Sequence, residues 1–223
     1  MYYLFFDTET TGLPSADSPA KARRGIWPDI VSIAWVLMRD DGVPVSSEYH
    51  IVYPEKWEIP PNSTEIHNIS TSMARSYGHM LDEVMFRFLR DVEKADVLIA
   101  HNMRFDQNVV NNALKWRLNH ERMLENYGKR MFCTMKESKD IVKIVTRTGT
   151  YKYPKLVELY RHLFGSEPKE LLHNSMGDVQ VMMKCFYEIW GKGLPADPDS
   201  IYNETDKVRN ITRLIVSLAE GIE

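Results

Sequence analysis

Three β-rich segments come before any long helical pattern in this chain, and that order limits the folds that it can adopt. The segments are residues 2–7, 29–39 and 45–53, and Asp40-Asp41-Gly42 joins the second to the third as a hairpin-type turn. Short apolar runs at 96–100 and 131–134 follow, each leading into a helical pattern. Antiparallel strands followed by strand–helix units predict one α/β domain with a mixed sheet.

Apolar periodicity and end signals predict the helices. The expected ranges are 63–68, 71–76, 80–94, 104–118, a helix from the strand at 131–134 to about 145, a helix beginning near Pro154 and ending at Gly165, and one from Asn174 or Ser175 to about Trp190. Near the C-terminus, Val208, Ile211, Ile215 and Leu218 form one apolar stripe. We expect residues 1–195 to form the domain and 196–223 a helical extension, packed on the domain or used for a partner or homodimer contact.

Charge is distributed unevenly. The net charge of −3 argues against a protein that coats long nucleic acid, but not against an enzyme that grips a few nucleotides. Residues 129–155 hold eight Lys or Arg against Glu137 and Asp140, and Lys136, Lys139 and Lys143 would share one helical face. The segment is either a solvated surface or a rim that steers phosphates.

Two further observations bear on the compartment. No apolar run approaches the roughly 18 residues that span a membrane, and the apolar start at residues 1–6 has no basic flank, so we predict no signal peptide. Cys133 and Cys185 are far apart and show no metal-type spacing. They are expected to be reduced core thiols of an intracellular protein.

Two acids stand side by side at the first predicted strand. Asp7 and Glu9 are two residues apart, so their side chains project to the same face. Such a pair repels unless a cation lies between them, and Mg²⁺ or Mn²⁺ suits oxygen ligands. Taken alone, the pair could equally be the exposed end of a strand.

Two more polar motifs lie at predicted element ends. Asp106 falls near the start of a helix that follows the strand at 96–100, where it could simply interact with the helix dipole. His173 precedes another helix, and Asp178 lies in its first turns, so the two side chains could converge. A surface histidine beside an ordinary helical acid is the alternative.

In this order, the three motifs resemble the DEDDh 3′→5′ exonucleases of the ribonuclease-H-like superfamily, which include polymerase proofreading subunits and stand-alone DNA exonucleases. The resemblance spans about residues 3–190 and includes Trp27-Pro28, Ile66-His67 and Tyr153-Pro154-Lys155-Leu156. It implies a ribonuclease-H-like α/β fold, with a mixed five-stranded sheet of three antiparallel strands and parallel additions, flanked by helices.

The resemblance also implies roles for residues. Asp7, Glu9, Asp106 and Asp178 would bind two divalent cations, Mg²⁺ or Mn²⁺, and His173 would act as general base. The expected substrate contacts are Thr8, Thr10, Thr11, Gly12, Leu13, His67, Asn102 and Phe105. Leu13 would wedge against a base or be a core residue, Asn102 could be a turn residue, and Phe105 could only pack the helix on the sheet. Where the family often has His-Gly-Ile, this chain has His67-Asn68-Ile69, which could tighten the pocket for the terminal base.

The expected function is metal-dependent release of nucleoside 5′-monophosphates from single-stranded or frayed 3′ ends of DNA, as in proofreading or DNA repair. Trimming of RNA 3′ ends is the closest alternative, because discrimination at the 2′-OH depends on pocket shape. A catalytically silent nucleic-acid-binding or polymerase-associated module is the third. We expect the protein to work in the cytoplasm or with the replicating nucleic acid, without secretion or a membrane.

Overall fold

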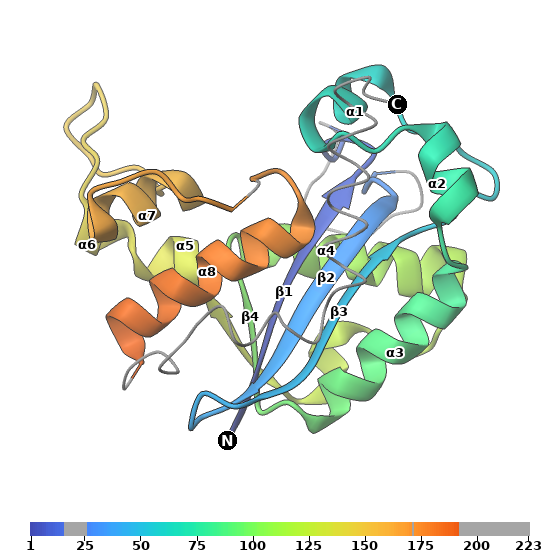
Figure 1. The fold of residues 1–223 in the computed structure, drawn as a ribbon, viewed down its shortest axis with the longest axis horizontal. Coiled ribbons are helices and arrows are strands. Elements are labelled where there is room, and N and C mark those ends of the chain that lie inside the picture. The colour runs from blue at the N-terminus through green and yellow to red at the C-terminus, as the bar shows by residue number, and fades with distance from the viewer. Residues whose placement is uncertain (16–25, 171, 192–223) are drawn as a thin grey trace.

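A mixed five-stranded sheet forms the centre of the protein, as a computed structural model shows for residues 1–15, 26–170 and 172–191 (Figure 1). The strands are β1 (Tyr2–Thr10), β2 (Ile30–Arg39), β3 (Pro44–Ile51), β4 (Val97–Ala100) and β5 (Arg130–Cys133), in the order β3-β2-β1-β4-β5. β1, β2 and β3 are antiparallel, whereas β4 and β5 add in parallel. The predicted sheet is confirmed.

The helices follow the predicted order. They are α1 (Pro61–His67), α2 (Thr71–Tyr77), α3 (Leu81–Lys94), α4 (Met103–Asn112), α5 (Thr134–Glu137), α6 (Lys139–Val142), α7 (Leu156–Phe164) and α8 (Ser175–Trp190). A π-helical turn, Ala113–Arg117, continues α4, and a 3₁₀ turn, Leu124–Tyr127, precedes β5. Gly165 caps α7 in the left-handed conformation, as expected of a glycine at that position.

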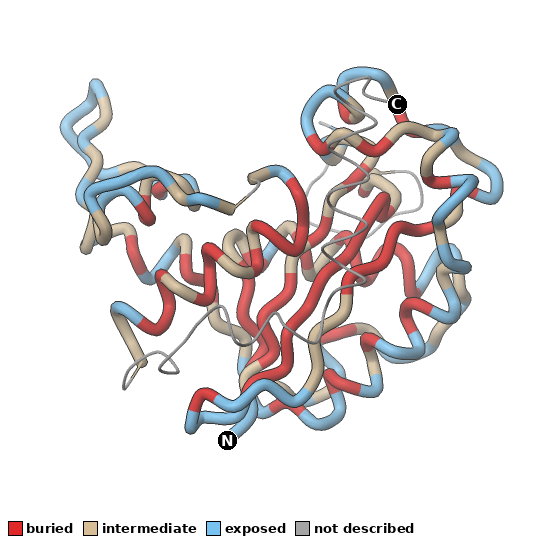
Figure 2. The backbone as a smooth tube through the Cα atoms, in the orientation of Figure 1, coloured by how far each residue is buried: buried red, intermediate tan, exposed pale blue. Residues whose placement is uncertain are grey.

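Each face of the sheet has its own apolar core. Leu4 and Phe6 pack with α3 and α4 on one face, whereas Phe5 packs with α8 on the other. Alternation along β1 explains this division, because neighbouring strand residues point to opposite faces. Figure 2 shows the buried residues along the central strands and on the inward side of α8. The sheet is thus the middle layer of three.

The topology gathers several element ends at one end of the sheet. β1 and β4 are parallel, so their carboxyl ends lie together, and α4 begins there two residues after β4. The first turn of α8 reaches the same end from the other face (Figure 1). Residues at the end of β1, the start of α4 and the start of α8 can therefore meet.

Two predicted helices differ from the structure. The helix expected from 104 to 118 is α-helical only to Asn112 and then widens into the π-helical turn. The helix expected to reach about 145 is divided at Ser138, whose hydroxyl donates to the carbonyl of Thr134 over 2.6 Å. Lys143 ends α6 with a φ of 54°, so the prediction that it shares one helical face with Lys136 and Lys139 is wrong.

The helical extension predicted for residues 196–223 lies outside the described residues. Within the described ranges, no helix is both long and apolar enough to cross a membrane. Cys133 and Cys185 are both buried and unpaired, as predicted.

Candidate active site

Three carboxylates meet between β1 and the first turn of α8. Asp7 and Glu9 project from β1 toward the face that α8 covers, the face on which Phe5 also lies. Asp178 is the fourth residue of α8. Carboxylate oxygens of Asp7, Glu9 and Asp178 lie within 4.8 Å of one another, and within the described residues this is the one such group that could hold a metal ion.

The start of α8, and with it Asp178, is fixed by buried polar contacts. The side chain of Asn174 accepts hydrogen bonds from the backbone N–H groups of Met176 and Gly177, which caps the helix. Its Nδ2 donates to the hydroxyl of Tyr49 over 3.4 Å. The Ser175 and Ser32 hydroxyls lie 3.1 Å apart in hydrogen-bond contact, so α8 is tied to β2 and β3.

Asp106 approaches the group from the other face of the sheet. It lies in the first turn of α4 and is 2% exposed. Its Oδ1 accepts two hydrogen bonds from Thr8, from the hydroxyl over 2.8 Å and from the backbone N–H over 3.1 Å. Thr8 points to this face because its two acidic neighbours on β1 point to the opposite one.

The pKa values of all four acids are raised, in each case mainly by burial. Burial, with smaller contributions from Asp106, Asp178 and Glu9, raises the pKa of Asp7 well above its ordinary value. Burial and then the charges of Asp178 and Asp106 raise the pKa of Glu9 to about 8. Burial is also the main cause that raises the pKa values of Asp106 and Asp178, each to about 7.

A divalent cation fits this set of donors. Four acids packed closely enough to raise one another's pKa values would be stabilised in their charged form by positive charge placed among them. Their ligand atoms are all carboxylate oxygens, which Mg²⁺ and Mn²⁺ prefer. The three convergent acids would hold the ion most directly, with Asp106 beside them.

His173 adjoins Asp178 through the backbone. Its N–H donates to Oδ2 of Asp178 over 3.2 Å, and this bond opposes the rise in the pKa of that acid. His173 has a φ of 60° and an exposed side chain. A left-handed conformation is uncommon for a residue other than glycine or asparagine. The imidazole is therefore presented to solvent next to the acid group.

The loop after β1 is held by its own threonines. The Thr10 hydroxyl donates to the Gly12 carbonyl over 2.7 Å. The hydroxyl of Thr11 accepts the backbone N–H of Asp29 over 3.0 Å, and the Thr11 N–H donates to the Asp29 carbonyl over 3.0 Å. Gly12 has a φ of 144°, which side chains rarely adopt. Thr10, Thr11 and Gly12 thus set the shape of the loop beside Glu9.

Leu13, at the end of this loop, is 84% exposed, so the alternative that it is a core residue is wrong. It lines an open pocket of about 380 Å³ together with Thr11, Trp27 and Trp116. Phe105 is partly buried and packs edge-on against Trp27, with ring centroids 5.9 Å apart. The packing role of Phe105 that the sequence left open is therefore present.

The other predicted contacts lie at turns. Asn102 has a φ of 83° and lies immediately before α4, as a turn residue would. His67 is buried at the end of α1, where its Nδ1 accepts the N–H of Ile69 over 3.2 Å and burial lowers its pKa to about 4. Asn68 caps α1 with a φ of 61°, a conformation that suits both glycine and asparagine.

Several contacts that shape the site join segments that are far apart in the sequence. The contacts of Thr8, Tyr49, Ser32 and His101 join segments between 33 and 143 residues apart, which no local pattern indicates. Only the capping role of Asn174 had a sequence signal, because asparagine before an apolar run favours a helix start.

Comparison with known proteins finds the same fold in solved structures of exonuclease I. The fold matches E. coli exonuclease I in complex with a dA16 oligonucleotide, with a TM-score of 0.62 and 17% identity, over 83% of this chain and 40% of that one. It also matches a product-bound exonuclease I, with a TM-score of 0.65 and 16% identity, over 96% and 48% of the two chains. For a moderately thermophilic exonuclease I from Methylocaldum szegediense the TM-score is 0.62 and the identity 16%, over 95% and 44%.

The chain spans less than half the length of these exonuclease I chains, and at this identity the likeness concerns the fold. No curated protein sequence matches significantly. Residues 4–186, however, match the RNase_T family, described as Exonuclease. That match includes the whole of the acid group, all of α4 and α8 as far as residue 186, and it covers well over half of the 223 residues. The protein therefore belongs to the Exonuclease family.

Proposed function

We propose that the protein is a 3′→5′ exonuclease that removes nucleoside 5′-monophosphates from single-stranded or frayed 3′ ends of DNA. The observation that carries this proposal is the convergence of Asp7, Glu9 and Asp178 within 4.8 Å, with Asp106 held alongside by Thr8. Solved exonuclease I structures with dA16 and dT13 oligonucleotides share the fold, which supports single-stranded DNA as the substrate.

The four acids would hold two divalent cations, Mg²⁺ or Mn²⁺. When bound, these ions would supply the positive charge that polarises the scissile phosphate and eases ionisation of water. The role of the chain itself is to place the carboxylates. Because burial raises the pKa values of the acids, they would release protons as the ions bind.

His173 would accept the proton of the attacking water. Its exposed imidazole is available to the water, and its backbone bond to Asp178 fixes it beside the acid group. The water oxygen would attack phosphorus in line with the leaving 3′-oxygen, and the P–O3′ bond would break. The leaving 3′-oxygen would take up a proton from solvent, and His173 would return the proton of the attacking water to solvent. The products are a nucleoside 5′-monophosphate and a strand, shortened by one nucleotide, that ends in a 3′-hydroxyl.

Leu13 would contact the terminal base. An exposed apolar side chain at the rim of a pocket can press against a base of any sequence. The loop set by Thr10, Thr11 and Gly12 would direct backbone groups, together with Thr8, toward the terminal nucleotide. The site would also be lined, less directly than by Leu13, by His67, Asn102 and Phe105.

A product assay on matched DNA and RNA tests the proposal. Each oligonucleotide is labelled at its 5′ end in one sample and at its 3′ end in another, in the same Mn²⁺ buffer. We expect the 5′-labelled DNA to give a ladder of strands that are progressively shortened from the 3′ end. The 3′-labelled DNA is expected to release labelled mononucleotide. Faster shortening of RNA would assign the site to RNA, and internal fragments would contradict an exonuclease.

A further inference from the structure

A β-hairpin between α6 and α7 projects from the protein toward the same end of the sheet as the carboxyl end of β1 (Figure 1). We name residues 143–152 the finger. The Thr146 N–H donates to the Thr150 carbonyl over 2.7 Å, and the Lys152 N–H donates to the Ile144 carbonyl over 2.9 Å. Gly149, with a φ of 81°, closes the turn by donating its N–H to the Thr146 carbonyl over 3.0 Å. The finger is thus an ordered hairpin where the sequence predicted the end of a helix.

The charged residues of the finger are all basic. Lys143, Arg147 and Lys152 lie in it, Lys155 follows it, and residues 143–155 contain no acid. Lys152 pairs with Glu158 of α7 over 2.6 Å. Lys143 and Arg147 are exposed and form no ion pair with any described residue. Two cations are therefore available to an anionic partner.

Aromatic rings and hydroxyl groups accompany these cations. Tyr151 and Tyr153 are 39% and 50% exposed, and Lys139 lies over the Tyr153 ring at 5.3 Å from its centroid. Thr148 and Thr150 are exposed on the same hairpin. Cations and hydroxyl groups bind phosphates, whereas exposed rings stack on unpaired bases without regard to sequence. The combination suits single-stranded nucleic acid.

The base of the finger is linked to both helices that carry acids of the site, α4 and α8. His101, just before α4, contacts the hydroxyl of Thr134 through Nδ1 over 2.9 Å and the carbonyl of Pro154 through Nε2 over 3.1 Å. Burial lowers the pKa of His101 to about 4, which keeps this bridge uncharged at neutral pH. On the other side, Leu159 of α7 packs with Val181 and Cys185 of α8. The base of the finger is therefore linked through His101 to the start of α4, which carries Asp106. Through α7 it is also linked to α8, which carries Asp178.

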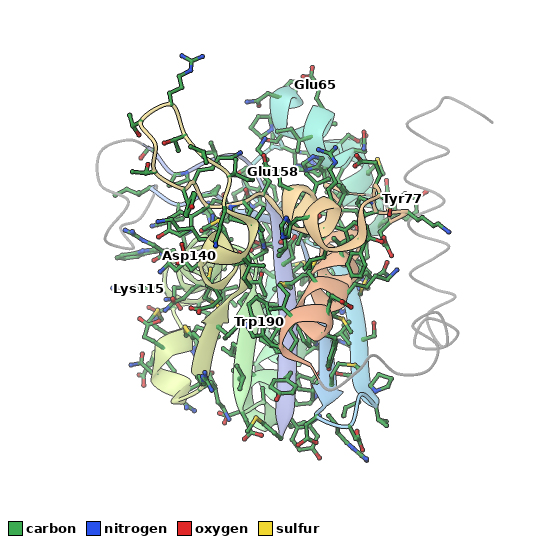
Figure 3. The ribbon with its side chains drawn as sticks, turned by 90° about the vertical axis from the view of Figure 1, so that its left-hand side faces the viewer. Glu65, Tyr77, Lys115, Asp140, Glu158 and Trp190 are labelled. Atoms are coloured by element: carbon green, nitrogen blue, oxygen red, sulfur yellow. The ribbon has the colours of Figure 1, made fainter. Side chains whose placement is uncertain are left out.

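The figures place the finger at the end of the sheet where the acids lie. Figure 1 shows it beyond α6 and α7, on the side of the α8 N-terminus opposite α1. In Figure 3, turned by 90°, it rises past Asp140 and Glu158 to about the level of α1, where Glu65 is labelled, and away from Trp190. A strand that ends at the acid group can therefore run along the finger.

We propose that the finger guides the DNA strand that leads into the active site, with Lys143 and Arg147 on its phosphates and Tyr151 against a base. The inference rests on the proposed function, because it concerns the part of the same substrate that lies 5′ of the scissile bond. It gives the finger, but not the rest of the basic segment 129–155, one of the two roles that the sequence left open for that segment.

The test compares a long oligothymidylate with a dinucleotide, which has a scissile bond but no strand to reach the finger. Lys143→Ala/Arg147→Ala and Tyr151→Ala are the variants. Arg87→Ala/Arg130→Ala is the matched control, since it removes two exposed cations, one on α3 and one at the opposite end of the sheet. KM and kcat are measured on both substrates, and binding of the long strand in EDTA is measured against salt concentration.

The double variant is expected to raise KM on the long strand on the order of tenfold and to lower the salt slope of binding by about 1.4, or about 0.7 for each lost phosphate contact. Tyr151→Ala is expected to weaken binding about fivefold or more. Both variants leave kcat and KM on the dinucleotide unchanged, and the control behaves as the parent on both substrates.

Unchanged binding and salt slope in the double variant would overturn the proposal, as would an equal loss on the two substrates. These results are separate from the fate of the proposed function. A parent protein that cuts neither substrate removes the exonuclease proposal, whereas the binding measurements in EDTA still report on the finger.

Discussion

Thr8 holds Asp106 by two hydrogen bonds to one carboxylate oxygen, 2.8 Å from its hydroxyl and 3.1 Å from its backbone N–H. The residues on either side of Thr8 are Asp7 and Glu9, which point to the opposite face of the sheet. β1 therefore supplies two acids of the site, and through Thr8 it also orients a third, Asp106 of α4. The relative positions of these acids depend on the alternation of a single β-strand.

We expect Thr8→Val to lower metal-dependent activity by about 10- to 100-fold, the usual cost of losing a partner that orients a metal ligand. Valine keeps the branched shape, but Asp106 retains only the backbone donor. Thr8→Ser keeps the hydroxyl and should stay near the parent. Activity and Mn²⁺ affinity are measured for all three proteins. Equal losses in the two variants would mean that packing, and not the hydrogen bond, matters at this position.

Replacement of His173 by asparagine should lower kcat by at least about 100-fold, the usual contribution of a general base. Asparagine tolerates the φ of 60° at this position, so the backbone bond to Asp178 is kept. The rise in melting temperature on addition of Mn²⁺ should therefore be the same as in the parent. Near-normal kcat in His173→Asn would remove the histidine from proton transfer.

The metal-free protein should become less stable as pH rises from about 4 to about 8. In the folded state the acids keep their protons until the pH nears their raised pKa values, about 7 for Asp106 and Asp178 and about 8 for Glu9. In the unfolded chain such acids lose their protons near pH 4. The folded state thus binds more protons, and stability that is present at low pH is lost through the folded pKa values.

Divalent cations should reverse this loss, with a larger rise in melting temperature at about pH 8 than at about pH 6. Thermal unfolding in EDTA, Mg²⁺ and Mn²⁺ measures both effects. Asp7→Asn removes one of the interacting charges, so its stability in EDTA should depend less on pH and respond less to metal. A metal response in Asp7→Asn equal to that of the parent would argue against the acid group as the binding site.

Leu13→Ala should change the free energy of unfolding by less than about 0.5 kcal/mol, because the side chain is 84% exposed and leaves no cavity. Its effect should instead appear as a higher KM on single-stranded DNA, since the contact with the terminal base is lost. Chemical denaturation and steady-state kinetics separate the two. A clear loss of stability with unchanged KM would favour a structural role for this leucine.

The sequence was sufficient for the sheet and for the acids on β1. Asp7 and Glu9 could be assigned to one face because strand periodicity is exact, and the order of β-rich and helical segments left few alternatives for the topology. The start of α8 was also predictable, since Asn174 is a common cap. In each of these cases the determining interaction is local in sequence.

The remaining features depend on contacts between distant segments. The support of Asp106 by Thr8 joins residues 98 positions apart, and the bridge from His101 to Pro154 spans 53. The break at Ser138 follows from one side chain bonding to the backbone in preference to solvent. The finger begins where Lys143, with a φ of 54°, ends α6, so neither its shape nor its position at the acid end of the sheet could be deduced from charge pattern alone.

The most direct test of the account is the metal dependence of DNA shortening by the parent and by Asp7→Asn. Purified protein is mixed with 5′-labelled single-stranded DNA in Mn²⁺ or in EDTA, and strand length and free nucleotides are followed together. We expect stepwise loss of nucleotides from the 3′ end, with release of nucleoside 5′-monophosphates, only for the parent protein and only with Mn²⁺. Intact DNA in that sample, or equal shortening by Asp7→Asn, would contradict the account.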